Sequence, residues 1–442
     1  MIESLLVANR GEIARRIIRT ASRLGVRTVA VHAEVDSELP FVAEADEVVA
    51  LPGGNPGQAY RDVAALLDAA KRTGAQAVHP GYGFLSENAD FARAVSDAGL
   101  IWVGPDAEAI TAMGDKIRAR NMMAAAGVPV APGTTDPVAD ADAAIAAAAD
   151  IGYPVMVKAA AGGGGMGMAT AADADALRAE YEKVRGFAER LFGDGSVLLE
   201  RHFPRVRHIE AQILGLADGS VVALGERECS VQRRHQKLAE ETPSPALSQQ
   251  QRRALLAAAV RAGETVSYRN AGTVEFLFDP EAGEFFFLEM NTRLQVEHPV
   301  TEAVYGLDLV EAQLRIAAGQ PVRVPTEPAG HALELRINAE DPKRFLPGPG
   351  AITSWVEPAG DGVRVDSGYA AGTTVTPHFD SLMAKLIVHG ADRAEVLARA
   401  RQAVAGFQIA GPKHNLPFFA ELLDNAEFVS GDYDTGIVGR MR

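Results

Sequence analysis

Cysteine is almost absent from this chain of 442 residues, in which Cys229 is the only one. No intrachain disulfide can form, a multi-cysteine zinc site is excluded, and the composition suits a reducing compartment. A lone cysteine is also more typical of a small core residue than of a nucleophile. No apolar stretch approaches the ~18 residues that a membrane span requires. The charged segment 1–16 does not resemble a signal peptide, so we expect a cytoplasmic protein.

Basic residues are also fewer than acidic ones. The 43 Lys and Arg residues and the 58 Asp and Glu residues leave a formal net charge of -15. This balance disfavours a general binder of nucleic acid or of anionic membranes, so any phosphate ligand must be held by a local basic pocket. The 47% of hydrophobic residues suffices for a sizeable core. At ~150 residues per domain, the length suggests about three domains.

Two common nucleotide-binding motifs are absent. G-x-G-x-x-G does not follow the first expected strand, and the P-loop pattern G-x-x-x-x-G-K-[ST] occurs nowhere. Dehydrogenases and P-loop enzymes therefore lose support. The hydrophobic periodicity over the first ~105 residues nevertheless predicts alternating strands and helices, and hence a parallel, doubly wound sheet. The expected strands are 5–8, 28–31, 76–79 and 100–103, and the expected helices are 12–24, 60–72 and 88–98.

A second, smaller unit is expected after a composition break at 127–143, a stretch with several Pro, Gly and Asp residues. Its expected elements are strands at 153–160 and 197–200 and a helix at 176–191. A run of four glycines stands between the first strand and the helix, at 162–165. A unit this small can move as a lid over a site.

The segment 273–291 is the most informative one. Two β-rich stretches flank the turn 279–283, and a hairpin centred there pairs Glu275 with Phe287 and places Glu289 diagonally across on the same face. Two carboxylates at this spacing can hold Mg²⁺ beside a nucleotide phosphate, although a solvated face is the commoner outcome for two acids alone. We expect this acidic face to be accessible. The opposite face is expected to form core with Val274, Phe276, Phe278, Phe286, Leu288 and Met290.

Two further stretches show the same alternation. The polar residues are His208, Glu210 and Gln212 in 207–214, and Glu334, Arg336 and Asn338 in 331–340. Joined to the hairpin in one sheet, these faces form the floor of an active site, whereas in separate strands they merely face water. The alternation alone favours neither interpretation, and the acidic hairpin favours the site.

Two stretches are candidate anion binders. The glycines at 162–167 follow Lys158 and can close their N–H groups over phosphates, although flexible linkers also collect glycine. Beyond the hairpin, Arg293 can hold a planar oxyanion, with Gln295 and the backbone N–H of Val296 as further donors. The alternative for Arg293 is a surface charge pair.

Longer motifs occur in order along the chain, at 8–14, 79–88, 232–237 and 289–299, together with the glycine loop. They resemble the biotin carboxylases of the ATP-grasp superfamily, and the resemblance covers essentially the whole chain. It implies an α/β ATP-grasp fold of three parts. These are an N-terminal doubly wound pre-ATP-grasp domain, a linker with a mobile lid domain, and a C-terminal mixed-sheet domain, at 1–112, 113–203 and 204–442.

The resemblance implies that biotin on a carrier protein is carboxylated through carboxyphosphate, with ATP, bicarbonate and Mg²⁺ or Mn²⁺. This is the first half-reaction of an acyl-CoA carboxylase, such as the acetyl-CoA carboxylase of fatty acid biosynthesis. The implied partners are a biotin carboxyl carrier protein, a carboxyltransferase subunit and a second copy of the chain. The final carboxyl acceptor is not readable from this chain, because that chemistry belongs to the partner.

The resemblance also assigns roles by matching position. Glu297 is the implied base for bicarbonate, Lys237 the clamp on carboxyphosphate, and Arg336 the residue that stabilises the biotin enolate, with Tyr82 near the biotin ring. The implied bicarbonate cradle is Arg293, Gln295 and Val296, and the implied metal ligands are Glu275, Glu289 and Asn291. The residues implied for the ATP site are Lys116, Lys158, Gly163, Gly164, Gly165, Glu200, His208, Gln232, His235 and Leu277.

Two departures from the family pattern affect these expectations. Met166 stands in the glycine loop where many members carry a basic residue, which removes one phosphate contact. The chain also has no Met-Lys-Met biotinylation motif, so a separate carrier is expected unless the sequence belongs to a longer polypeptide. Two other functions are considered: an ATP-grasp ligase that joins a carboxylate to an amine, and a non-catalytic nucleotide-binding subunit.

Overall fold

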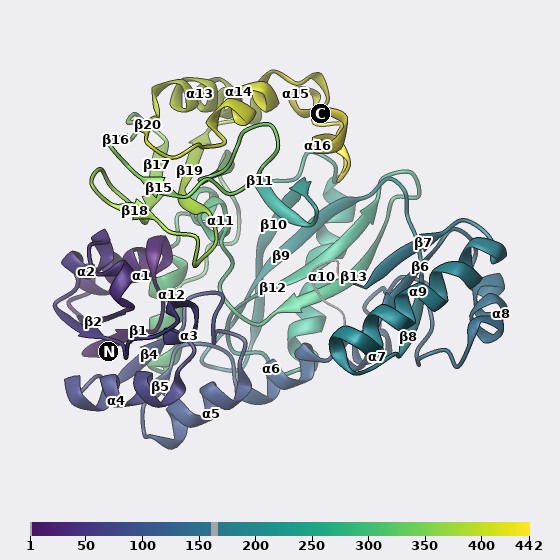
Figure 1. Ribbon diagram of the computed structural model, residues 1–442, viewed down its shortest axis with the longest axis horizontal. Coiled ribbons are helices and arrows are strands. Elements are labelled where there is room, and N and C mark those ends of the chain that lie inside the picture. Colours follow the sequence, from purple (N-terminus) through teal and green to yellow (C-terminus); the bar gives the residue numbers. More distant parts are fainter. Residues whose placement is uncertain (1, 161–166) are drawn as a thin grey trace.

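The computed structural model describes residues 2–160 and 167–442 (Figure 1). Its N-terminal part is a parallel sheet with the strand order β3-β2-β1-β4-β5, which confirms the predicted doubly wound sheet. Alternate residues of β1 enter two separate cores, because helices cover both faces. The strands are β1 Ser4–Val7, β2 Arg27–His32, β3 Glu47–Ala50, β4 Ala77–His79 and β5 Ile101–Trp102.

The helix expected at 60–72 begins later than predicted. The Asp62 side chain accepts a hydrogen bond from the Ala65 N–H, so the helix starts at Val63 and a separate short helix precedes it. Gly74 ends it in the left-handed region, at φ +62°. The helices of this part are α1 Gly11–Arg23, η1 Glu34–Asp36, α2 Pro40–Glu44, α3 Pro56–Ala59, α4 Val63–Thr73, α5 Ala89–Asp97, α6 Ala107–Gly114 and α7 Lys116–Ala125.

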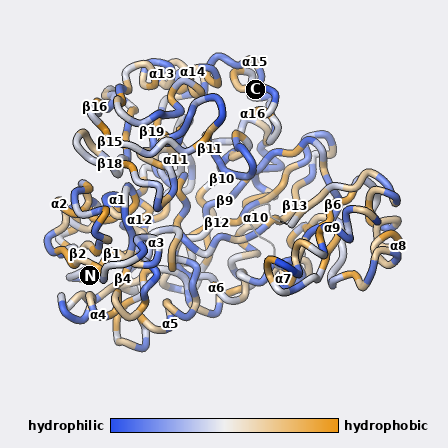
Figure 2. Tube along the Cα trace, in the orientation of Figure 1, coloured by the Kyte–Doolittle hydropathy of each residue, from blue (hydrophilic) through white to orange (hydrophobic). Residues whose placement is uncertain are grey.

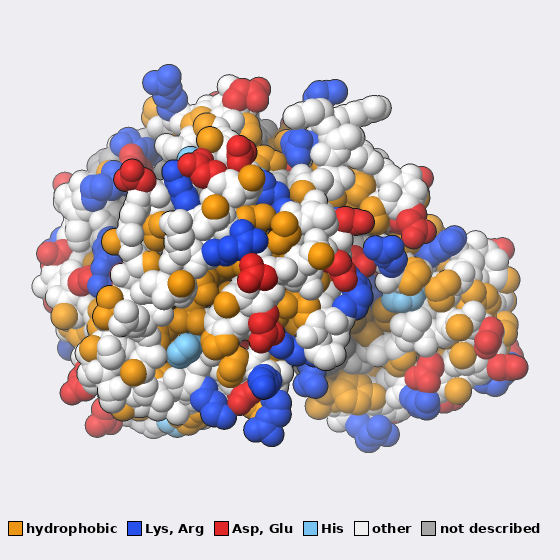
Figure 3. Space-filling model, turned by 90° about the horizontal axis from the view of Figure 1, so that it is seen from above, with side chains coloured by type: hydrophobic (Ala, Val, Ile, Leu, Met, Phe, Trp, Pro, Cys, Tyr) orange, Lys and Arg blue, Asp and Glu red, His pale blue; other side chains and the backbone are white. Residues whose placement is uncertain are grey.

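A small lobe, at the right of Figures 1 and 3, holds the expected lid elements. Its sheet has the order β7-β6-β8 and packs against two helices around a core of its own. The strand β7 was not expected, and the run of four glycines at 162–165 lies outside the described residues. The elements are α8 Ala141–Ile151, β6 Val155–Ala159, β7 Met168–Ala171, α9 Ala174–Phe192 and β8 Val197–Arg201.

The centre of the molecule is a sheet with the order β13-β12-β9-β10-β11-β14-β19-β17. A mixed sheet is expected here, but every ladder described in it is antiparallel, because hairpins join many of its consecutive strands. The strands are β9 Arg207–Gly215, β10 Val221–Arg233, β11 Gln236–Thr242, β12 Asn270–Asp279, β13 Glu284–Asn291, β14 His331–Asn338, β17 Val363–Ser367 and β19 Leu382–Gly390.

The two faces of this sheet differ in character, and in Figure 2 hydrophobic and hydrophilic residues both occur along its central strands. One face packs on the helix α10, with Ile209, Ala211 and Val274 in a shared apolar core. The helix α11 lies on the other face, where the polar side chains gather. The helices are α10 Gln249–Thr265, α11 His298–Tyr305, α12 Leu309–Ala317, α13 Arg393–Gly406, α14 Leu416–Asp424, α15 Ala426–Ser430 and α16 Ile437–Arg440.

Two short strand pairs complete the C-terminal part, β15 Gly350–Ala351 with β18 Thr374–Val375 and β16 Ser354–Val356 with β20 Gln408–Ala410. In the described parts of the chain, no helix combines the length and the apolar composition needed to cross a membrane.

Candidate functional site

The acidic hairpin forms, but its register differs from the expected one. Glu275 lies directly opposite Glu289, whereas the next pair toward the turn is Phe276 with Phe287. A β-bulge between these pairs inserts Leu288 as an extra residue on β13. The predicted pairing of Glu275 with Phe287 is therefore wrong, and the two carboxylates are direct cross-strand neighbours rather than diagonal ones.

The bulge also changes which side chains of β13 enter the core. Phe287 and Met290 are buried there, and Phe285 packs against them, so the expected core positions Phe286 and Leu288 are wrong. Phe286 instead stacks on Phe203, with ring centroids 4.9 Å apart. Because Phe203 lies shortly after the end of β8 at Arg201, this stack connects the small lobe to the hairpin.

The polar strand faces do join the hairpin in one sheet, but they are not open to water. His208, Glu210 and Gln212 are buried, as is Glu275, which is 5% exposed. Glu289 is different, because its side chain is 39% exposed. The acidic face expected to be accessible is thus accessible only at Glu289.

Lys237 is the central cation of this face. Its Nζ donates hydrogen bonds to Glu210 Oε2 at 2.6 Å, Glu275 Oε1 at 2.9 Å and Glu297 Oε1 at 2.8 Å. Burial lowers the pKa of the Lys237 ammonium, but these three carboxylates outweigh it and hold that pKa well above its usual value. The ammonium therefore stays charged.

A second cation, Arg227, was not identified from the sequence. Its guanidinium is fully buried and donates to Glu210 Oε1 at 2.5 Å, to Gln212 Oε1 at 2.8 Å and to the hydroxyls of Thr273 and Thr301 at 3.0 Å each. Arg227 thus orients the strands beneath the site. A signal for it in the sequence was the polar alternation of β9, which provides two of its partners, Glu210 and Gln212.

Glu297 and Arg336 meet on the same face. Arg336 Nη2 donates to Glu297 Oε2 at 2.9 Å and lies 2.6 Å from Glu240 Oε1. Burial raises the pKa of Glu297, but Lys237 and Arg336 outweigh it and hold that pKa well below its usual range. Glu297 is therefore an ionised carboxylate held between two cations.

Arg293 follows the hairpin, and its hydrogen-bond network meets that of Lys237 at Glu275 Oε1. Its guanidinium donates to Glu87 Oε2 at 3.0 Å, Gln295 Oε1 at 2.8 Å and Asn291 Oδ1 at 2.9 Å. The side-chain amides of Asn291 and Gln295 donate to Glu275 Oε1 at 2.9 and 3.1 Å. The charge pair considered as the alternative for Arg293 is present as its contact with Glu87. The same guanidinium also donates to Asn291, one of the metal candidates.

The residues expected at the ATP site that the structure describes do not form one cluster. His208, Gln232 and Leu277 gather beside Glu275, with His208 Nε2 2.9 Å from Glu275 Oε2. Lys116 Nζ lies 3.3 Å from Glu289 Oε2. In the small lobe, Lys158 on β6 pairs with Glu200 on β8. His235 is exposed in the turn between β10 and β11. Gly163, Gly164, Gly165 and Met166 lie outside the described residues.

The donor set at the hairpin fits a divalent cation of the magnesium type. Glu275 and Glu289 offer carboxylate oxygens on adjacent strands, and Asn291 adds an amide oxygen. Among the described residues, the donors to Glu275 Oε1 are the side chains of Lys237, Asn291 and Gln295, which can rotate away. The residues present therefore suit hard-cation binding, with Glu289 as the ligand most open to solvent.

Two further residues discussed from the sequence, Cys229 and Tyr82, lie near this face. Cys229 is buried with its Sγ 4.0 Å from Glu297 Oε1, and burial raises the pKa of its thiol well above the usual value. It behaves as a core residue, as expected, and not as a thiolate nucleophile. Tyr82 is partly buried, and its hydroxyl donates to Glu12 Oε1.

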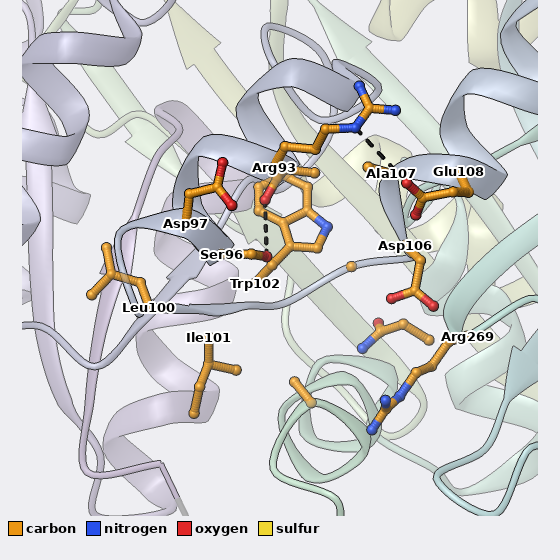
Figure 4. Close-up of a pocket in the computed structure, with 14 residues that line it drawn as sticks. Arg93, Ser96, Asp97, Leu100, Ile101, Trp102, Asp106, Ala107, Glu108 and Arg269 are labelled. Atoms are coloured by element: carbon orange, nitrogen blue, oxygen red, sulfur yellow. Dashed lines mark hydrogen bonds and ion pairs between the residues drawn. The ribbon is translucent and has the colours of Figure 1, made fainter.

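A cavity of about 390 Å³ lies elsewhere, between α5, β5 and α6 (Figure 4). Arg93, Trp102, Glu108 and Arg269 are among its lining residues, and Arg93 pairs there with Glu108 at 3.8 Å. The lining includes none of the expected site residues that the structure describes. The polar face of the central sheet is therefore the candidate site.

Three family models match the chain in succession. They are described as biotin carboxylase, N-terminal domain, at residues 1–110, carbamoyl-phosphate synthase L chain, ATP binding domain, at 115–324, and biotin carboxylase C-terminal domain, at 334–440.

Similar proteins were found over nearly the full length. A biotin carboxylase of Pseudomonas aeruginosa is 47% identical over 435 residues, 98% of this chain and 96% of that protein. The biotin-dependent acyl-coenzyme A carboxylase alpha3 subunit of Mycobacterium leprae is 48% identical over 97% of this chain and 72% of its own length. The biotin carboxylase domain dimer of Hydrogenobacter thermophilus 2-oxoglutarate carboxylase, in complex with MgADP, ADP and bicarbonate, has a TM-score of 0.94 at 42% identity, covering 100% of this chain and 98% of that one.

Proposed function

The chain belongs to the biotin carboxylase family, and we propose that it carboxylates biotin on a carrier protein with ATP and bicarbonate. The family and the ATP-grasp fold predicted from the motifs are confirmed by the matches along nearly the whole chain. The observation that carries the proposed chemistry is the placement of Glu297 between Lys237 and Arg336, at 2.8 and 2.9 Å.

Bicarbonate is assigned to the segment 293–297. The guanidinium of Arg293 offers a planar fork for the anion once it turns from its present partners, with Gln295 and the Val296 backbone beside it. Glu297 accepts the bicarbonate proton. Its pKa is well below the usual range while Lys237 and Arg336 both contact it, so incoming anions that draw these cations away make it more basic.

ATP is assigned to the space between the lid and the hairpin, where His208, Gln232 and Leu277 meet and Lys116 faces Glu289. Glu275, Glu289 and Asn291 would hold Mg²⁺, which offsets the charge of the phosphates during phosphoryl transfer. The Lys237 ammonium, which contacts three carboxylates, can form an ion pair with the phosphoryl oxygens. The transfer joins the γ-phosphoryl group to a bicarbonate oxygen and releases ADP.

Biotin is assigned to the space near Tyr82 and Arg336. Carboxyphosphate breaks down to carbon dioxide and phosphate, and the phosphate can take the proton from the biotin nitrogen. The Arg336 guanidinium then stabilises the biotin oxygen that becomes negative. A lid closed over the site keeps water from the intermediate.

The partners and the division of the chain are part of the proposal. A biotin carboxyl carrier protein brings the biotin, a carboxyltransferase subunit uses the product, and two copies of the chain form a homodimer. The divisions 1–112, 113–203 and 204–442 serve as the N-terminal, lid and C-terminal domains. The similar proteins are named for acyl-CoA and 2-oxoglutarate carboxylation, which supports an acceptor set by the partner.

The test is ADP release with MgATP and free biotin, measured with and without added bicarbonate. We expect release that depends on bicarbonate and rises with biotin, and nitrogen-carboxylated biotin as the product. ADP release that is the same with and without bicarbonate and biotin would contradict the proposal and favour the ATP-grasp ligase. Nucleotide binding without any turnover would favour the regulatory subunit.

A further inference from the structure

Lys385 on β19 is fully buried, although none of the roles described above involves it. Its Nζ donates a hydrogen bond to the backbone carbonyl of Val296 at 2.9 Å and lies 3.1 Å from Glu12 Oε2. The neighbouring Asp366 is farther away, at 4.0 Å, and pairs with Arg364 at 2.7 Å. Lys385 therefore connects Glu12 to the segment assigned to bicarbonate.

Glu12 continues this connection to the N-terminal domain. It lies in the first turn of α1, it is buried, and its second oxygen, Oε1, accepts a hydrogen bond from the Tyr82 hydroxyl. The two oxygens of one carboxylate thus contact Lys385 on one side and Tyr82 on the other. Burial raises the pKa of Glu12 to about 7, and the Lys385 ammonium opposes this rise.

The backbone around Tyr82 is held separately. The Asn9 side-chain amide donates to the carbonyls of Pro80 and Tyr82 at 2.6 and 2.8 Å. A Cβ at Gly81 would come within 2.8 Å of Asn9 Nδ2, so the glycine permits this close approach. Since Asn9 fixes the backbone, the hydroxyl contact with Glu12 serves to set the direction of the Tyr82 ring.

We propose that Glu12 and Lys385 are positioning residues that couple Tyr82 to the segment 293–297, so that the biotin and bicarbonate positions adjust together. This proposal rests on the proposed function for the identity of the two ligands. A buried ion pair is weak evidence for a purely stabilising role, because well-packed apolar residues often replace such a pair at no loss of stability. Here each member also holds an atom of a proposed substrate segment.

The decisive measurement is ATP turnover with bicarbonate in the absence of biotin. Tyr82→Phe keeps the ring and removes only the hydroxyl that contacts Glu12. If the coupling exists, this variant raises the KM for bicarbonate roughly 2- to 30-fold although the bicarbonate segment is unchanged. Glu12→Gln, which keeps an acceptor for Tyr82 but loses the charge facing Lys385, raises it as well, while the KM for ATP stays constant in both variants.

The matched control is Tyr369→Phe. The Tyr369 hydroxyl is buried, and it accepts a hydrogen bond from Arg10 Nη2 at 3.1 Å. This variant removes a hydroxyl that, like the Lys385–Glu12 pair, connects the N-terminal part of the chain to the C-terminal part, but it leaves Glu12 and Lys385 unchanged. We expect its KM for bicarbonate to match that of the unmodified protein.

A second readout does not depend on activity. In Tyr82→Phe and Glu12→Gln, amide hydrogen exchange at 293–300 is expected to accelerate, whereas Tyr369→Phe leaves it unchanged. An unchanged KM for bicarbonate in folded, active variants overturns the coupling, as does unchanged exchange. If the unmodified protein shows no bicarbonate-dependent turnover, the proposed function fails, and the exchange rates still decide whether Tyr82 and the segment are linked.

Discussion

Glu240 on β11 lies directly opposite Glu334 on β14, and neither side chain is exposed to solvent. Both oxygens of Glu334 lack a hydrogen-bond partner within the part of the chain that the structure describes. Burial raises the pKa of Glu334 well above its usual value and that of Glu240 to about 7, with the Arg336 guanidinium opposing the rise at Glu240. Two buried carboxyl groups side by side cannot both ionise readily, so this pair holds a proton near neutral pH.

Glu334→Gln tests this proton. A raised pKa means that the folded protein still binds a proton at a pH where the unfolded chain has lost it. The free energy of unfolding contributed by this pair therefore falls as the pH rises from about 4.5 toward 7. We expect the decline between pH 4.5 and pH 8 to be smaller in the variant than in the unmodified protein, because the variant lacks a carboxyl group whose pKa burial raises. Urea unfolding at several pH values measures it, with Glu281→Gln on the exposed turn as control. Equal declines in the variant and the unmodified protein would refute the prediction.

Glu297→Gln tests the base. The amide fills the same space but cannot accept the bicarbonate proton, so we expect bicarbonate-dependent ADP release to fall by at least roughly 100-fold. Nucleotide binding, followed by calorimetry, should change little, because Lys237 keeps its contacts with Glu210 and Glu275. A variant that retains full turnover would instead support the ATP-grasp ligase.

Glu289→Gln tests the metal site. Since this side chain is 39% exposed, its loss should hardly affect stability, but the Mg²⁺ concentration for half-maximal ADP release should rise at least roughly 10-fold. Glu284→Gln, at an exposed position of the same strand, is the matched control. The metal assignment fails if both variants require the same Mg²⁺ concentration as the unmodified protein.

Cys229 provides a prediction about reactivity. Burial raises the pKa of its thiol, so iodoacetamide at pH 8 should label the folded protein far more slowly than the chain in urea. Cys229→Ala should lower the free energy of unfolding by about 1 kcal/mol and leave turnover nearly unchanged. Rapid labelling of the folded protein with loss of turnover would show that the thiol takes part in the reaction.

The alternation of apolar and polar residues correctly separates the two sides of β9 and β14. Ile209 and Leu335 are buried in apolar cores, while Glu210 and Arg336 belong to the polar side. The same rule fails on β13, because the bulge at Leu288 breaks the period of two and directs Phe287 rather than Phe286 into the core. Bulges depend on cross-strand pairing, which a local pattern does not contain.

The motifs place Glu297, Lys237 and Arg336 in one site, but they do not indicate which charges meet. Glu210, Arg227 and Glu240 had no assigned role. Glu210 nevertheless helps to raise the pKa of Lys237 and pairs with Arg227, and Glu240 pairs with Arg336. Nor did the segment 8–14 indicate that Glu12 contacts a tyrosine at 82. Such contacts join residues that are distant in the chain.

The amino-acid sequence by itself determines the family, the N-terminal doubly wound sheet and most of the apolar positions on β9, β12 and β14, because these follow from short-range periodicity and from motifs that are continuous in the chain. Only the tertiary structure decides that Glu275 faces Glu289, that Lys237 sits among three carboxylates and that Lys385 reaches Val296. The physical reason is that the charge and pKa of a buried group depend on the neighbours that strand register and domain packing bring within hydrogen-bonding distance.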